Sequence, residues 1–195
     1  MPAMSSSPSI ISNHHGPRIY LAGPDVFFPC QEDIFQALKA QCAHLGMVGL
    51  APTDTALSPA THPEPHDLAQ AIYEGNVEMI RQSDGVIANL MSFRGQEPDS
   101  GTVFEVGFAV ALGKPVVGYG VPEGTYADRV AAAIACSSDA VGEVRETDTG
   151  AMVEGFGQPL NLMLARSIRL APTAREALEW LAAELGAQTK RPSGV

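Results

Sequence analysis

Two carboxylates, Asp99 and Glu105, lie close together in the stretch PDSGTVFEVGFAVALGKPVVGY, residues 98–119. A pair of carboxylates at one cavity is typical of enzymes that break glycosidic bonds. One acts as the nucleophile while the other handles the proton on the leaving group. A carboxylate nucleophile forms a covalent glycosyl intermediate and so divides one difficult step into two. The stretch therefore raises glycosyl chemistry as a hypothesis.

The same two residues also have purely structural explanations. Asp99 precedes an expected helix and can be its N-cap, a role worth about 1 kcal/mol. Glu105 can lie at the exposed edge of that helix, although apolar neighbours such as Phe104 and Val106 flank it. A glutamate inside a core would also need a nearby Lys or Arg. If the helix begins near Ser100, both carboxylates reach one cavity only when Asp99 lies in the loop above the helix. Composition and spacing leave these alternatives open.

The elements expected around this pair alternate between strand and helix. Short apolar runs predict strands over residues 18–22, 47–50, 84–89, 115–119 and 167–170. Apolar residues at helical spacing, bounded by start and stop signals, predict helices over residues 31–46, 67–82, 100–112, 125–135, 159–166 and 173–185. The connections include a proline-rich loop over 52–66 and a loop or hairpin over 137–157.

The predicted strands are continuous apolar runs, which indicates a parallel sheet buried on both faces. We therefore expect a single α/β domain over residues 18–187, with helices on both faces and a flavodoxin- or Rossmann-like strand order. Ligands in such folds bind beyond the carboxyl ends of the strands, so the loops over 23–29, 91–98 and 118–125 should line one mouth. Residues 1–17 and 188–195 are expected to be disordered.

Composition excludes several classes of protein. The chain has 195 residues, of which 45% are hydrophobic, so it can bury a core without disulfides. A net charge of −10 argues against nucleic-acid or membrane-surface binding, but not against a small nucleoside. Cys30, Cys42 and Cys136 form no CxxC pair, which predicts reduced and buried thiols. Without a signal-peptide pattern or a long apolar run, we expect a cytoplasmic protein with no membrane partner.

No metal or cofactor is expected. His62 and His66 are four residues apart, but prolines lie between them, so they are predicted to be loop histidines rather than ligands. The glycine-rich turns carry neither P-loop nor GxGxxG spacing.

At several separated places, in the same order, the chain resembles the nucleoside 2-deoxyribosyltransferase family. RIYLAGPDVFFP (18–29) resembles the family's opening strand and its Ala-Gly-Pro loop, and EGNVEMIRQSDGVIANL (74–90) resembles the next helix and strand. FRGQEPDSGTVFEVGFAVALGKPVVGY (93–119) resembles the signature block, with an Asp, a Gly-Thr and a Glu-x-Gly at this spacing. QPLNLMLA (158–165) resembles the late Asn-x-Met element.

The resemblance implies a role for each matched residue. Glu105 matches the nucleophile that attacks C1′ of deoxyribose, and Asp99 matches a residue that contacts the base and helps proton transfer. Tyr20 matches a tyrosine whose hydroxyl orients the nucleophile. Asn161 and Met163 match a pair that a neighbouring subunit donates to hold the sugar. The resemblance thus implies a homo-oligomer with composite sites, whose ligands are a nucleoside and a nucleobase.

Further substrate-binding residues are expected from the same blocks. They are Asp25, Phe27, Asn76, Arg94 and Gly101. Phe27, together with Phe28, is expected to form a wall for base stacking, with core packing as the alternative. Arg94 is expected either to pair with Asp99 or Glu97 or to be a solvated loop charge.

Two positions depart from the family pattern. Asn76 falls where many members have Asp, and Asp is also common at the position of Asn89. Both changes lower the negative charge of the pocket and leave the base preference open.

The activity implied is transfer of 2-deoxyribose between nucleobases in nucleotide salvage, through a glycosyl-glutamate intermediate. Relatives with the same signature hydrolyse the N-glycosidic bond of nucleosides or nucleoside 5′-monophosphates, so hydrolysis is an alternative. A non-catalytic nucleoside-sensing module is a second alternative.

Overall fold

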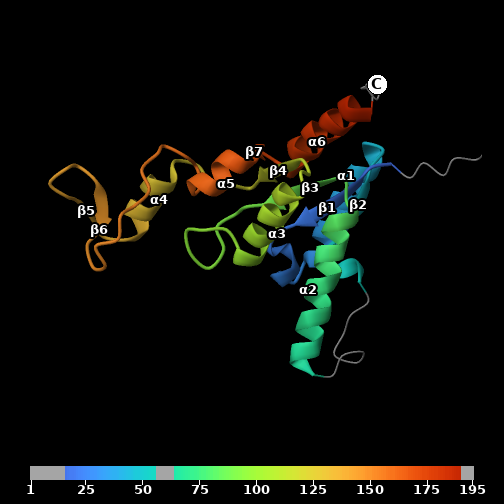
Figure 1. The fold of residues 1–195 in the computed structure, drawn as a ribbon, viewed down its shortest axis with the longest axis horizontal. Helices are drawn as coiled ribbons and strands as arrows, with labels where there is room; N and C mark the ends of the chain where they lie inside the picture. The colour runs from blue at the N-terminus through green and yellow to red at the C-terminus, as the bar shows by residue number, and fades with distance from the viewer. Residues whose placement is uncertain (1–15, 56–63, 190–195) are drawn as a thin grey trace, which may run out of the picture.

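A parallel sheet forms the centre of the fold (Figure 1). The computed structural model describes residues 16–55 and 64–189. Within them, five strands form one sheet in the order β2-β1-β3-β4-β7, and every pairing is parallel. These strands are β1 (Arg18–Ala22), β2 (Val48–Leu50), β3 (Gly85–Asn89), β4 (Val116–Tyr119) and β7 (Arg169–Leu170). Counted along the chain, this is the flavodoxin-like order 2-1-3-4-5, as predicted.

Helices cover both faces of the sheet, which confirms the predicted α/β class. Successive residues of a strand point to opposite faces. In β1, Ile19 and Leu21 pack in one core with α1 and α6, whereas Tyr20 and Ala22 pack in the other with α2, α3 and α5. The bounds are α1 (Gln31–His44), α2 (Pro65–Gln82), α3 (Ser100–Ala111), α5 (Leu162–Ser167) and α6 (Ala174–Thr189).

An arm extends to one side of the sheet (Figure 1). It consists of α4 (Tyr126–Ala133) and an antiparallel hairpin of β5 (Cys136–Ser138) and β6 (Val144–Glu146). The hairpin lies in the segment 137–157, for which the sequence predicts a loop or hairpin. Its strands are mostly polar and none of their residues is fully buried, so the arm has few side chains with which to pack on the body.

The proline-rich connection differs from the loop predicted over 52–66. It begins with a 3-10 turn, η2 (Pro52–Asp54), and α2 starts at Pro65. Proline at the first helical position is favourable because the missing N–H has no partner there in any case. His66 is therefore helical rather than in a loop, and it is exposed. His62 lies outside the described residues.

Most of the ends that the sequence predicts to be disordered lie outside the described residues. The carbonyl of Pro17 accepts a hydrogen bond from Val48 N at 2.8 Å, and α6 continues to Thr189. The prediction of buried cysteines holds for Cys42 alone, because Cys30 is exposed and Cys136 is partly exposed.

Within the described ranges, no helix is both long and apolar enough to cross a membrane. The same ranges contain no cluster of three or more His, Cys, Asp or Glu side chains arranged to hold a metal ion.

Candidate active site

A cavity of about 430 Å³ opens beyond the carboxyl end of β1. Its walls come from η1 (Pro24–Phe27), from η2 and the residue after it, and from one face each of α2 and α3. This is the edge of the sheet where a parallel α/β fold is expected to bind its ligand. The described residues that line it are Gly23, Val26, Phe27, Pro52, Thr53, Thr55, Ile72, Asn76, Asp99, Gly101, Thr102 and Glu105.

Glu105 lies on the inner face of α3 and contacts Tyr20. Thr102, Val106 and Ala109 are the buried residues of this helix. Glu105 is three residues after Thr102 and four before Ala109, so it shares their face. Tyr20 lies on the face of β1 that α3 covers and is 0% exposed. Its hydroxyl donates a hydrogen bond to Glu105 Oε1 at 2.6 Å. The alternative of an exposed helix-edge glutamate is therefore wrong.

Burial sets the protonation of this pair. It raises the pKa of Glu105 from 4.5 to about 7; the Tyr20 hydrogen bond opposes this rise, and the negative charge of Asp99 adds to it. Burial and the charge of Glu105 also raise the pKa of Tyr20 well above its ordinary range, so its hydroxyl remains a donor. At neutral pH, a glutamate with this pKa is divided between a neutral acid and a poorly solvated carboxylate, and a carboxylate of that kind is suited to nucleophilic attack.

Asp99 is both an N-cap and a cavity residue. Its Oδ2 accepts hydrogen bonds from the Thr102 backbone N–H at 2.9 Å and from Thr102 Oγ1 at 3.1 Å. The structural explanation for Asp99 is thus correct, yet the residue also lines the cavity with Glu105. Gly101 leaves room for it, because a Cβ there would lie 3.0 Å from Asp99 Oδ2.

Asn76 brings an unpaired amide into the cavity wall. Its Oδ1 is buried and has no hydrogen-bond partner among the described residues. A buried acceptor without a partner is costly, so a ligand that donates a hydrogen bond here satisfies it. Ile72 lines the cavity one helical turn earlier, and the four-residue spacing from Asn76 could have identified it.

Phe27 forms an aromatic wall with Phe93. Phe27 lines the cavity, is 57% exposed and stacks on Phe93 with ring centroids 5.3 Å apart. The Arg94 guanidinium lies 4.7 Å from the Phe93 centroid and 5.6 Å from that of Phe27. Arg94 thus makes cation–π contacts, and it forms no ion pair with Asp99 or Glu97 within the described part of the chain. Phe28 is half-buried and outside the cavity wall.

Asp25, predicted to bind substrate, lies outside the cavity wall. It is 6% exposed, and both of its carboxylate oxygens accept from Asn89 Nδ2 at 3.1 Å. Burial raises the pKa of Asp25, and the hydrogen bond from Asn89 opposes that rise. The sequence indicated neither this pair nor the two threonines, Thr53 and Thr55, that η2 and the following residue bring to the cavity.

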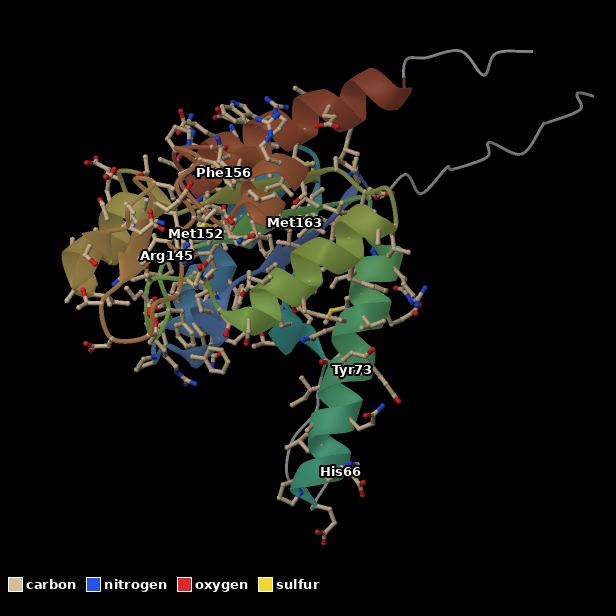
Figure 2. All side chains as sticks on the ribbon, turned by 60° about the vertical axis from the view of Figure 1, so that its left-hand side comes forward. His66, Tyr73, Arg145, Met152, Phe156 and Met163 are labelled. Atoms are coloured by element: carbon tan, nitrogen blue, oxygen red, sulfur yellow. The ribbon has the colours of Figure 1, made fainter. Side chains whose placement is uncertain are left out.

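Asn161 and Met163 lie at the start of α5, away from the cavity of their own chain. Asn161 caps the helix, since its Oδ1 accepts from Met163 N at 3.0 Å and its Nδ2 donates to Glu154 at 2.9 Å. Met163 is 72% exposed. Figure 2 shows it with Met152 and Phe156, two further exposed apolar residues from the segment between β6 and α5.

Comparison with known proteins places this chain in a family. A family model described as nucleoside 2-deoxyribosyltransferase matches residues 19–163. A solved 2-deoxyribosyltransferase from Leishmania mexicana is 30% identical and superposes with a TM-score of 0.66, covering 86% of this chain and 98% of that one. A conserved protein from Enterococcus faecalis has the same coverage at 23% identity and a TM-score of 0.54, which shows the shared fold.

A further relative is found by sequence. An uncharacterized protein of Schizosaccharomyces pombe is 32% identical over 118 residues, which cover 60% of this chain and 56% of that protein. The chain therefore matches little more than half the length of that relative. Since the family model spans most of the chain, the chain belongs to the nucleoside 2-deoxyribosyltransferase family.

Proposed function

We propose that the chain transfers 2-deoxyribose from one nucleobase to another through a covalent glycosyl intermediate on Glu105. The observation that carries the proposal is the 2.6 Å hydrogen bond from Tyr20 Oη to Glu105 Oε1, in a cavity that Asp99 also lines. The likeness to the Leishmania mexicana enzyme, which covers nearly all of that protein, supports the reaction class.

In the first step, the Glu105 carboxylate attacks C1′ of the nucleoside. The bond from C1′ to the base nitrogen breaks, its electron pair stays on that nitrogen, and Asp99 delivers the proton that neutralises the base. Tyr20 holds one carboxylate oxygen, which leaves the other to form the ester. The transition state carries positive charge on the sugar. The Glu105 carboxylate stabilises that charge, and so does Asp99 as it gives up its proton.

In the second step, another base enters the place that the first one left. Its nitrogen attacks C1′, the Glu105 carboxylate departs, and Asp99 accepts the proton of the incoming base. Two displacements at C1′ give net retention of configuration. Both steps balance in atoms and charge, so the proposal calls for no cofactor.

The rest of the cavity suits a nucleoside. Phe27 offers a ring face for base stacking, and the unpaired Oδ1 of Asn76 accepts from a donor on the base or sugar. The volume of about 430 Å³ lies within the range of small-molecule sites.

The proposal includes a homo-oligomer with composite sites. Asn161 and Met163 are not among the described residues that line the cavity of their own chain, and Met163 is exposed, which fits a role in the site of a second copy. Mixing Glu105→Ala and Met163→Ala chains, each inactive alone, should then restore base exchange. A mixture no more active than the sum of its parts contradicts the composite site.

The decisive assay incubates the protein with deoxyinosine, with and without adenine. Deoxyadenosine that forms only with adenine supports the transferase, whereas free deoxyribose regardless of adenine indicates a hydrolase. Nucleoside-dependent thermal stabilisation without turnover indicates a sensing module. Glu105→Ala should remove exchange while the fold is kept, and Glu123→Ala, at an exposed loop glutamate, is the matched control. Exchange by Glu105→Ala at near the parent rate refutes the proposal.

A further inference from the structure

One buried amide joins two segments that lie apart in the sequence. Asn89 is the last residue of β3 and is 8% exposed. Its Nδ2 donates to both carboxylate oxygens of Asp25 in η1, at 3.1 Å each. Its Oδ1 accepts from the backbone N–H of Met91, at the start of the loop that leads to α3, at 3.3 Å. The same side chain is thus bonded to η1 and to this loop.

These two segments carry the aromatic wall of the cavity. Phe27 belongs to η1 and Phe93 to the loop, and their rings stack at 5.3 Å with planes 21° apart. Arg94 spans the two rings. Phe27 is more than half exposed, so the core does little to fix its ring. The position of the wall therefore depends on how η1 and the loop are held relative to each other.

We infer that Asn89 and Asp25 are positioning residues that set the aromatic wall against which the nucleobase binds. Neither of them is among the described residues that line the cavity, so they act through Phe27 and Phe93. The inference rests on the proposed function for the identity of the ligand. Its structural half, the coupling of η1 to the loop, stands independently of that function.

This coupling explains why an amide suits position 89. Asp25 needs a donor, and an aspartate at 89 would place two carboxylates together in a site with little solvent. The surroundings also hold the pair tightly. A Cβ at Gly23 would lie 2.5 Å from Asp25 Oδ2, and one at Gly120 would lie 2.5 Å from Asn89 Oδ1. Both glycines leave the space that the pair occupies.

Three variants test the coupling. Asn89→Leu keeps the approximate shape and removes both hydrogen bonds, and Asn89→Asp removes the donor. The double variant Asp25→Asn with Asn89→Asp exchanges the two groups and restores one donor facing one carboxylate. Hydrogen–deuterium exchange, read by mass spectrometry without substrate, reports the backbone over residues 23–29 and 90–97.

Both single variants should raise the rate of hydrogen–deuterium exchange about tenfold in these two segments, since a hydrogen bond to a carboxylate is lost. The nucleoside KM should rise about tenfold while kcat stays within about twofold, because the wall holds substrate before and during the reaction alike. The double variant should return most of the way to the wild-type rate of deuterium exchange and to the wild-type KM. Ser83→Ala, which removes a buried hydroxyl at the other end of β3, is the matched control and should change neither.

Several results overturn the inference. One is hydrogen–deuterium exchange at the wild-type rate in both single variants. Another is a double variant that exchanges as fast as Asn89→Asp. A third is a fall in kcat at constant KM, which would place Asn89 in the chemical step. If the wild-type protein transfers no deoxyribose, the proposed function fails, and the exchange data still decide whether the coupling exists.

Discussion

Replacing Tyr20 by Phe tests how Tyr20 affects the pKa of Glu105, the proposed nucleophile. The change removes the hydroxyl that donates to Glu105 at 2.6 Å and keeps the ring in the core. A hydrogen bond to a charged group is worth about 1.5–3 kcal/mol, which corresponds to about 1–2 pKa units. Burial and the charge of Asp99 remain in the variant. The pKa of Glu105 should therefore rise from about 7 to about 8–9.

The pH dependence of kcat/KM for base exchange measures this rise in the pKa of Glu105. In the proposed mechanism Glu105 must be ionised to attack, so kcat/KM rises with pH through the pKa of Glu105. The midpoint of this rise, on the acid side of the profile, gives that pKa in the free enzyme. The wild-type limb should lie near pH 7, and the Tyr20→Phe limb about 1–2 units higher. Below both limbs, at about pH 6, the variant should be about 10–100-fold slower, and the gap should narrow above about pH 9.

The carboxyl carbon of Glu105 gives the same pKa without substrate, through a ¹³C NMR titration of glutamate-labelled protein. Tyr119→Phe is the matched control, since Tyr119 is also a buried tyrosine in a strand of the central sheet. It has no hydrogen bond to Glu105, so its limb should stay at the wild-type position. An unchanged limb and an unchanged carboxyl titration in Tyr20→Phe would refute the reasoning.

Four further substitutions, at three positions, follow from the site. Because the folded pKa of Glu105 is raised from 4.5 to about 7, its ionisation costs about 3 kcal/mol of folding stability. Glu105→Gln should abolish base exchange and raise the free energy of unfolding in urea by up to that amount at about pH 8, with the gain absent below about pH 4.5. Asp99→Asn keeps an acceptor for Thr102, so stability should change by less than about 0.5 kcal/mol, whereas Asp99→Ala loses about 1 kcal/mol in the same urea measurement. Both Asp99 variants should slow exchange about 100-fold or more. Asn76→Leu should raise the nucleoside KM about tenfold at unchanged or higher melting temperature, and an unchanged KM would remove Asn76 from substrate binding.

The layers and strand order could be predicted because they depend on local patterns. Solid apolar runs such as 84–89 mark strands buried on both faces, and alternation with helices favours a parallel sheet. The 3-10 geometry of η1 and η2 could not be predicted in the same way, since proline and glycine there signal a turn without its geometry.

The environment of Glu105 was harder to predict. Its apolar neighbour Phe104 is largely exposed, whereas Thr102 is buried. The residue types around Glu105 therefore misidentify the inner face of α3. The contact with Tyr20 spans 85 residues and depends on how α3 is placed against β1. Only the resemblance to a known family predicted the contact between Tyr20 and Glu105.

The choice of partner for Glu105 also follows from the chemistry. A glutamate inside a core is expected to need Lys or Arg, yet no ion pair of the described residues includes Glu105. Its partner is the neutral hydroxyl of Tyr20, which orients the carboxylate and favours its ionised form. A cation at the same place would also favour ionisation, but it would repel the positive charge that develops on the sugar. A neutral donor avoids that repulsion, and Asp99 adds negative charge to the cavity at the cost of a higher Glu105 pKa. In the proposed mechanism, the raised pKa is therefore a consequence of a site that suits a cationic transition state.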